Sequence, residues 1–173
     1  MTSLTPPGAA EDLVIVETAQ GHVRGRRRDG VSVFKGMRYG ADTGGANRFR
    51  PPQPVAAWTG VQDAFAFGDQ CPQMRGMLAD KGPMSEDCLR VNVWTPAADG
   101  AGRPVMLWFH GGGFEAGSAS QKVYDGTRLA LRGDVVVVTI NHRLNVYGHC
   151  YLGDRMGEAY AGSGNAGYLD LIA

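Results

Sequence analysis

The 173-residue chain carries 17 Lys and Arg residues against 17 Asp and Glu residues, so its formal net charge is zero. A balanced charge argues against binding to nucleic acid or to an anionic membrane surface, because such proteins normally carry an excess of cations. Hydrophobic residues make up 43% of the sequence and charged residues 20%, which excludes a disordered chain and is typical of a soluble globular domain.

The start of the chain predicts no export signal. Residues 1–12 have neither the basic stretch nor the apolar core of a signal peptide, and we expect a flexible leader there. The longest apolar run, 135–140, is far shorter than the ~20 residues of a membrane-spanning helix. We therefore expect a cytoplasmic protein that spans no membrane, and the composition rich in Arg, Ala and Gly suggests a bacterial one. Cys71, Cys88 and Cys150 are too scattered for a zinc site, so neither a metal nor a cofactor is expected.

Short alternating segments separated by glycine turns predict an antiparallel meander early in the chain. Its strands are expected at 13–17, 22–27 and 31–34. The basic stretch 24–28 could indicate phosphate binding, but a glycine lies inside it and a hairpin surrounds it. We therefore interpret it as a solvated strand face. Residues 36–86 show few periodic stretches and are predicted to be mostly loop.

The second half of the chain has the pattern of an α/β protein. Residues 89–94 alternate like a half-buried strand, whereas 104–109 and 135–140 are nearly continuous apolar runs. Such runs are typical of strands buried on both faces of a parallel sheet. A helical segment is predicted at 124–132, which gives the order strand, glycine-rich loop, helix, strand. This βαβ unit indicates an α/β fold, with one domain over 13–173.

The loop His110–Gly117, with the sequence HGGGFEAG, directly follows the apolar run 104–109. Consecutive glycines allow neighbouring backbone N–H groups to converge on one point, where a dinucleotide pyrophosphate or the oxyanion of an acyl-transfer intermediate fits. A dinucleotide site needs G-x-G-x-x-G and an acidic residue at the end of the next strand. The glycines of this loop follow the wider pattern G-x-G-x-x-x-G, and the next strand ends without an acidic residue. A purely structural loop is less favoured because the glycines lie at the end of a buried strand.

Several motifs occur in an order that identifies a family. They are RFRPP at 48–52, WTG at 58–60, SEDCL at 85–89, NVW at 92–94, HGGGF at 110–114, NHRL at 141–144 and GNAGYLD at 164–170. In this order they resemble the type B carboxylesterases, the cholinesterase-like branch of the α/β-hydrolases. The resemblance implies the N-terminal portion of an α/β-hydrolase fold, in which antiparallel strands lead into a parallel central sheet. It also implies a serine esterase that hydrolyses small-molecule carboxylic esters through an acyl-enzyme.

The resemblance assigns the backbone N–H groups of Gly112 and Gly113 to an oxyanion hole, with a third donor from the residue after the nucleophilic serine. Removing one such donor typically costs ~2.7–4 kcal/mol of transition-state stabilisation. His110 is not the catalytic base, because the family triad runs Ser, then Asp or Glu, then His. The other histidines have no carboxylate partner at a recognisable spacing. They are His22, His142 and His149.

The resemblance also implies structural contacts around the site. Two ion pairs are expected, Arg48 with Glu86 and Arg143 with Asp170. Planar Arg–carboxylate pairs of this kind can fix loops at the edge of a site. Cys71 and Cys88 match cysteines that frame an active-site loop in secreted relatives, and whether they are bridged stays open.

The nucleophile elbow G-x-S-x-G is absent from the 173 residues, and the nearest segment, 30–34, lacks the second glycine. The sequence also stops within an apolar helical pattern, 168–173, which we interpret as truncation before the elbow. The serine, the acid and the histidine of the triad are therefore missing, and this chain alone is expected to be inactive. The alternative is a non-catalytic cholinesterase-like binding protein or an inactive gene fragment. The intact oxyanion motif favours the enzyme.

Overall fold

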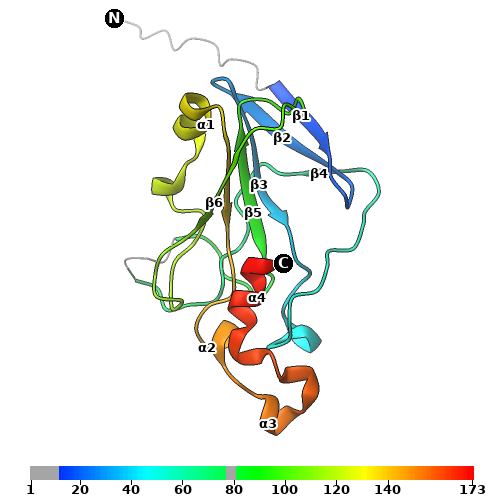
Figure 1. Cartoon of the computed structure of the whole chain (residues 1–173), viewed down its shortest axis with the longest axis vertical. Helices are drawn as coiled ribbons and strands as arrows, with labels where there is room; N and C mark the ends of the chain where they lie inside the picture. Colours follow the sequence, from blue (N-terminus) through cyan, green and yellow to red (C-terminus); the bar gives the residue numbers. More distant parts are fainter. Residues whose placement is uncertain (1–11, 77–80) are drawn as a thin grey trace, which may run out of the picture.

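A computed structural model describes residues 12–76 and 81–173 of the chain. Within these ranges seven strands form one mixed sheet in the order β1-β2-β3-β5-β7-β6, with β4 beside β2. Figure 1 shows α1 alongside one end of the sheet and α2, α3 and α4 beyond the opposite end. The strands are β1 (Asp12–Glu17), β2 (His22–Arg28), β3 (Val31–Arg38), β4 (Val61–Asp63), β5 (Arg90–Thr95), β6 (Val105–Phe109) and β7 (Val136–Ile140). The helices are α1 (Thr127–Gly133), α2 (Asn145–His149), α3 (Gly153–Met156) and α4 (Ala166–Ile172).

The predicted antiparallel meander is confirmed in β1, β2 and β3. Asp29 and Gly30 join β2 to β3 with φ angles of 51° and 81°, the left-handed pair that a two-residue hairpin turn requires. β3 runs four residues beyond its predicted end because it continues through a bulge at Gly36, where φ is 69° and an added Cβ would lie 2.4 Å from the carbonyl oxygen of Ala66. The short strand β4, parallel to β2, lies in the segment predicted to be loop.

The basic stretch of β2 presents a solvated face, as predicted. Arg24, Arg26 and Arg28 share one side of the strand, and the first of them donates to the carboxylate of Asp63 over 2.7 Å. The predicted leader lies outside the described residues except for Asp12, which already belongs to β1.

The predicted βαβ unit consists of β6, α1 and the parallel strand β7. α1 begins three residues later than expected. Just before the helix, a side-chain oxygen of Asp125 accepts the N–H of Thr127 over 3.0 Å, which forms a turn rather than a helical start at 124. On its other side β7 pairs antiparallel with β5, so the sheet is mixed.

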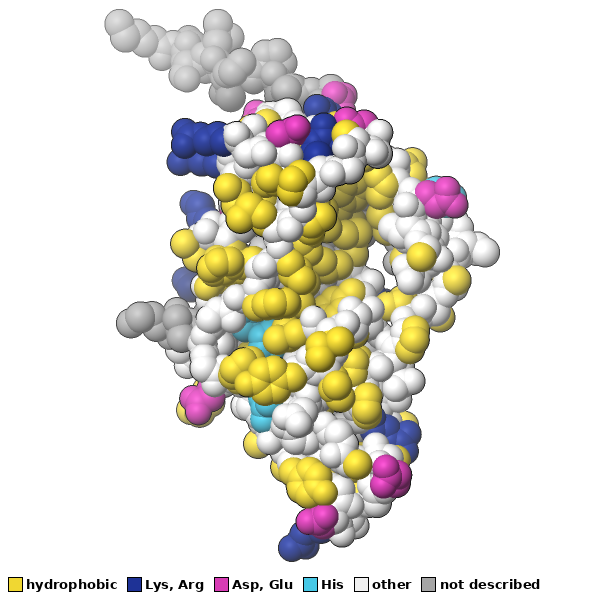
Figure 2. Space-filling model, in the orientation of Figure 1, with side chains coloured by type: hydrophobic (Ala, Val, Ile, Leu, Met, Phe, Trp, Pro, Cys, Tyr) yellow, Lys and Arg dark blue, Asp and Glu magenta, His cyan; other side chains and the backbone are white. Residues whose placement is uncertain are grey.

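The prediction that both apolar runs are buried strands is wrong for β6. Its five side chains, from Val105 to Phe109, are 43–63% exposed, because β6 is the edge strand of the described sheet. β7 lies between β5 and β6 and buries Val137 and Ile140. Figure 2 shows the resulting band of hydrophobic side chains down the middle of this face. An apolar run therefore predicts a strand correctly without deciding where in the sheet it lies.

Three small clusters of buried side chains form the core. One surrounds Trp94 between β5, β7 and α1, a second surrounds Phe34 in the meander, and the third surrounds Leu89 and Leu144 beside the segment that follows β7. The third cluster supports the site described below. Every helix in the described part of the chain is too short to cross a membrane.

Candidate functional site

The parallel pairing of β6 with β7 brings two loops to one edge of the sheet. The glycine-rich loop leaves β6 at His110, and the NHRL segment leaves β7 at Asn141. Because parallel strands end at the same edge, the residues that follow them become neighbours. The imidazole of His110 stacks on that of His142 with 4.8 Å between ring centroids and 16° between planes. This stack is a contact that sequence reasoning missed.

The glycine-rich loop adopts a conformation that side chains would obstruct. Gly112 has a φ of 133°, and an added Cβ would lie 1.8 Å from the carbonyl oxygen of Ala116. Gly113 has a φ of 63°. Among residues 12–76 and 81–173, no acceptor takes a hydrogen bond from the N–H of Gly112 or Gly113. The loop thus holds two adjacent unpaired donors.

Two side-chain amides fix the far end of this loop. Gln73 donates from Nε2 to the carbonyl oxygen of Gly117 over 2.8 Å and accepts its N–H over 2.6 Å. The side-chain oxygen of Asn141 accepts the N–H of Ala119 over 2.7 Å. Sequence reasoning missed both roles. The role of Asn141 could have been inferred from its position directly after an apolar strand, whereas Gln73 lies in a segment whose sequence shows no pattern.

Phe114 is held in the left-handed region, with a φ of 60°, by the rings around it. Its ring centroid lies 5.8 Å from His142, 5.2 Å from His149 and 4.9 Å from Tyr168. Its carbonyl oxygen accepts the N–H of Asn145 over 2.6 Å. A non-glycine residue in this region is strained, and the contacts of the Phe114 ring with its aromatic neighbours offset part of that cost.

Burial favours the neutral form of both stacked imidazoles. Burial lowers the pKa of His142 to about 4, and the nearby His110 lowers that pKa further, because a second positive charge is unfavourable there. Burial also lowers the pKa of His110. In each ring Nδ1 contacts the carbonyl oxygen of the next residue, over 3.1 Å in His110 and 3.0 Å in His142. No carboxylate of the described residues hydrogen-bonds either ring.

Acidification should therefore destabilise the fold through His142. The unfolded side chain titrates near pH ~6.5 and the folded one near 4, so between these values the unfolded state binds the extra proton. We expect the free energy of unfolding to fall by about 3 kcal/mol over that range. Urea unfolding measured at several pH values checks this result. His142→Phe, which keeps the ring contacts, should flatten the dependence, and an identical pH dependence in both proteins would contradict the assignment.

A cavity of about 1050 Å³ opens beside the unpaired donors. Gly113 and Phe114 form one wall, and Met74, Val146 and Tyr147 contribute apolar surface elsewhere. A volume of this order suits a small organic molecule, and apolar walls with few polar groups are typical of small-molecule sites. The loop thus presents its donors next to a space that a ligand can fill.

Arg143 and Asp170 form a buried ion pair that ties the segment after β7 to α4. The guanidinium donates from Nε over 2.8 Å and from Nη2 over 2.6 Å, and the backbone N–H of Arg143 adds a third bond of 2.9 Å. The two side chains are 3% and 0% exposed. Burial raises the pKa of Asp170, while the hydrogen bonds from Arg143 act in the opposite direction.

The second expected pair is bidentate too, but it lies at the surface. Arg48 donates to Glu86 over 2.6 Å and 2.5 Å, and its side chain is 46% exposed. Cys71 and Cys88 are buried as free thiols, and their mutual hydrogen bond, together with burial, raises the pKa of Cys88. The possible disulfide between them stays a hypothesis. Within the described ranges no group of three or more His, Cys, Asp or Glu side chains is placed to hold a metal ion.

Comparison with known proteins agrees with this geometry. Residues 12–173 match the carboxylesterase family. The para-nitrobenzyl esterase of Bacillus subtilis is 42% identical over 92% of this chain and 33% of its own length. Human carboxylesterase 3 is 40% identical over 91% of this chain and 30% of its own. The crystal structure of a carboxylesterase from Geobacillus stearothermophilus superposes with a TM-score of 0.85 at 50% identity, covering 91% of this chain and 32% of that one. The chain therefore spans about a third of the length of the relatives it matches.

Proposed function

The chain belongs to the carboxylesterase family, and on this premise we propose that it supplies the oxyanion hole of a serine carboxylesterase. The observation that carries the proposal is the pair of adjacent unpaired N–H groups on Gly112 and Gly113 after β6, with Gly113 itself lining the cavity. The same donors would equally suit a pyrophosphate, but the family membership favours acyl transfer.

In the proposed reaction a serine oxygen attacks the ester carbonyl and the carbonyl oxygen becomes an oxyanion. The N–H groups of Gly112 and Gly113 donate to that oxygen. Their dipoles are already oriented by the loop, so no reorganisation is needed when the charge develops. Collapse of the tetrahedral intermediate expels the alcohol and leaves an acyl-enzyme, which water then hydrolyses. The serine and its acid–base partners come from sequence outside these 173 residues, since no G-x-S-x-G occurs within them.

The apolar cavity beside Gly113 would receive part of the ester. Met74 and Val146 offer surface for an aliphatic or aromatic group, and the donors fix only the carbonyl oxygen. We therefore propose small apolar carboxylic esters as the substrate class. A cytoplasmic location is part of the same proposal and rests on the sequence alone.

A non-catalytic binding protein is the second candidate. It is suggested by the apolar cavity beside Gly113, whose walls suit a small ligand whether or not a nucleophile acts on it. In that case the same cavity binds a ligand without turning it over.

A chimera separates these candidates. Residues 12–173 would replace the matching third of the Bacillus subtilis para-nitrobenzyl esterase. We expect the chimera to hydrolyse p-nitrophenyl acetate and to be labelled by a fluorophosphonate, and the 173-residue chain alone to do neither. A folded chimera that is labelled without turning over ester would contradict the oxyanion assignment. Labelling of the 173-residue chain would show that a nucleophile had been overlooked.

A further inference from the structure

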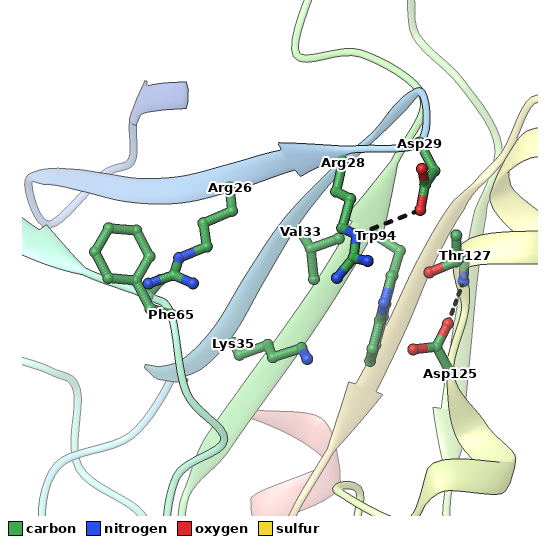
Figure 3. A pocket seen from close by; sticks show the side chains of 10 residues that line it. Arg26, Arg28, Asp29, Val33, Lys35, Phe65, Trp94, Asp125 and Thr127 are labelled. Carbon is green, nitrogen blue, oxygen red and sulfur yellow. Dashed lines mark hydrogen bonds and ion pairs between the residues drawn. The ribbon is translucent and has the colours of Figure 1, made fainter. Parts of the chain in front are cut away.

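A second cavity, of about 320 Å³, lies on the arginine face of the meander. Figure 3 shows it between β2, β3 and β5 on one side and the segment before α1 on the other. Arg26, Arg28 and Lys35 bring positive charge to it, and Phe65 and Trp94 bring aromatic surface. It shares no lining residue with the cavity beside the glycine-rich loop.

Trp94 leaves a buried donor unsatisfied in the wall of this cavity. The residue is 1% exposed, and its indole Nε1 has no hydrogen-bond partner. Buried polar groups in folded proteins are almost always paired, so an orphan indole N–H at a cavity points to an absent acceptor. Figure 3 shows the charged ends of Arg28 and Lys35 pointing toward the same indole.

Lys35 is a second donor without an anionic partner. Its ammonium group lies 4.3 Å from the ring centroid of Phe67, and no carboxylate of the described residues forms an ion pair with it. Arg26 lies over the ring of Phe65, 4.5 Å from its centroid. The ring of Phe67 stabilises the ammonium group of Lys35 from one side and leaves its charge available to an anion on the other.

The two carboxylates of the cavity already have donors. Asp125 accepts the N–H of Thr127 over 3.0 Å, and Asp29 lies 3.5 Å from Nε of Arg28. The cavity therefore offers unpaired donors, one of them charged, and its acceptors are engaged. The side chain of Arg28 is 80% exposed, and among residues 12–76 and 81–173 that long contact is its only ion pair, so it can move aside from the indole.

We propose that this cavity binds a small planar organic anion. Its carboxylate or phosphate group would lie between Lys35 and Arg28 and accept a hydrogen bond from Nε1 of Trp94. Its apolar body would pack on Val33 and Phe65. The volume matches a single-ring compound and is at the small end of the range for small-molecule sites. The proposal is independent of the esterase function, because it uses none of the residues assigned to the oxyanion hole.

The test follows the indole N–H resonance of Trp94 by NMR while the 173-residue chain is titrated with benzoate at constant ionic strength. The neutral ester methyl benzoate is the matched probe for apolar contact alone. We expect benzoate to shift the Trp94 resonance saturably and methyl benzoate to leave it unchanged. Lys35→Gln should weaken benzoate binding about tenfold or more, as expected for loss of a charge-assisted contact. Lys122→Gln, at an exposed lysine outside the cavity, should not weaken it.

Three results would overturn the proposal. The first is the absence of a saturable shift with benzoate. The second is an equal shift with methyl benzoate, which would show apolar partitioning. The third is equal weakening by Lys35→Gln and Lys122→Gln, which would show general charge attraction. Trp94→Phe, checked for folding by circular dichroism and titrated by calorimetry, should also weaken binding, because it removes the donor and keeps an aromatic ring.

Discussion

Gly112→Ala should lower the kcat of the chimeric esterase about 100- to 1000-fold, as is typical when one oxyanion donor is lost. The added Cβ would lie 1.8 Å from the carbonyl oxygen of Ala116, at a φ of 133° that alanine rarely adopts. The loop must therefore shift, and its N–H groups move away from the oxyanion. Because these donors act mainly on the developing charge, KM should change much less than kcat. Steady-state kinetics with p-nitrophenyl acetate measures both constants.

Gly111→Ala is the matched control in the same loop. A Cβ at Gly111 meets nothing within 4 Å and the residue does not have a left-handed φ, so activity should stay within a few-fold of the parent. Fluorophosphonate labelling and the melting temperature report whether each variant is folded with its nucleophile intact. If folded Gly112→Ala turned over ester as fast as Gly111→Ala, the loop would have no part in stabilising the oxyanion.

Asp170→Ala should reduce the free energy of unfolding by about 3–5 kcal/mol, the usual cost of removing one partner of a buried ion pair. The substitution leaves the guanidinium of Arg143 buried, at 3% exposure, without its carboxylate partner. The guanidinium loses two hydrogen bonds, and the backbone N–H of Arg143 loses its acceptor. Its remaining acceptors are the backbone oxygens of Arg50 and Ala166. Urea unfolding of the 173-residue chain provides the measurement, with the chimera as a second context.

Glu86→Ala removes the carboxylate from the other bidentate pair and serves as the control. Because the side chain of Arg48 is 46% exposed, water can replace the lost contact, and the expected cost is about 1 kcal/mol or less. Asp170→Asn keeps the shape of the side chain and removes its charge, so its effect separates charge from packing. Equal losses in Asp170→Ala and Glu86→Ala would mean that the burial of Arg143 does not determine the energetics of the pair.

The sequence predicted the strands well wherever a repeating pattern and a turn signal coincided. The Asp29–Gly30 turn fixed the hairpin of β2 and β3, and the apolar runs located β6 and β7 to within a residue. The burial of β6 could not be predicted, because an apolar run looks the same in a central strand and in an edge strand. β4 was missed because three residues are too few to show an alternation.

Some residues of the candidate site could be predicted from the sequence and others could not, depending on whether a local pattern marks them. Gly112 and Gly113 stood out because three consecutive glycines are rare and have a direct physical meaning. The two hydrogen bonds between the side chain of Gln73 and the backbone of Gly117 join residues 44 positions apart, and no local sequence pattern indicates them. The stack of His110 on His142 could have been predicted, because His110 directly follows one predicted parallel strand and His142 lies two residues after the other. The possible bridging of the cysteines and the cellular location stay hypotheses.

The long connection between β3 and β5 has a consequence for how the chain folds. β3 ends at Arg38 and β5 begins at Arg90, yet the two pair antiparallel at the centre of the sheet, with Phe34 opposite Val93. The hairpins of β1, β2 and β3 close over short turns and can form early. The central pairing must instead bring together residues far apart in sequence, and that closure costs entropy before any contact compensates for it. The rate of folding is therefore expected to be limited by this closure, and the N-terminal meander is expected to form before β5 pairs with β3.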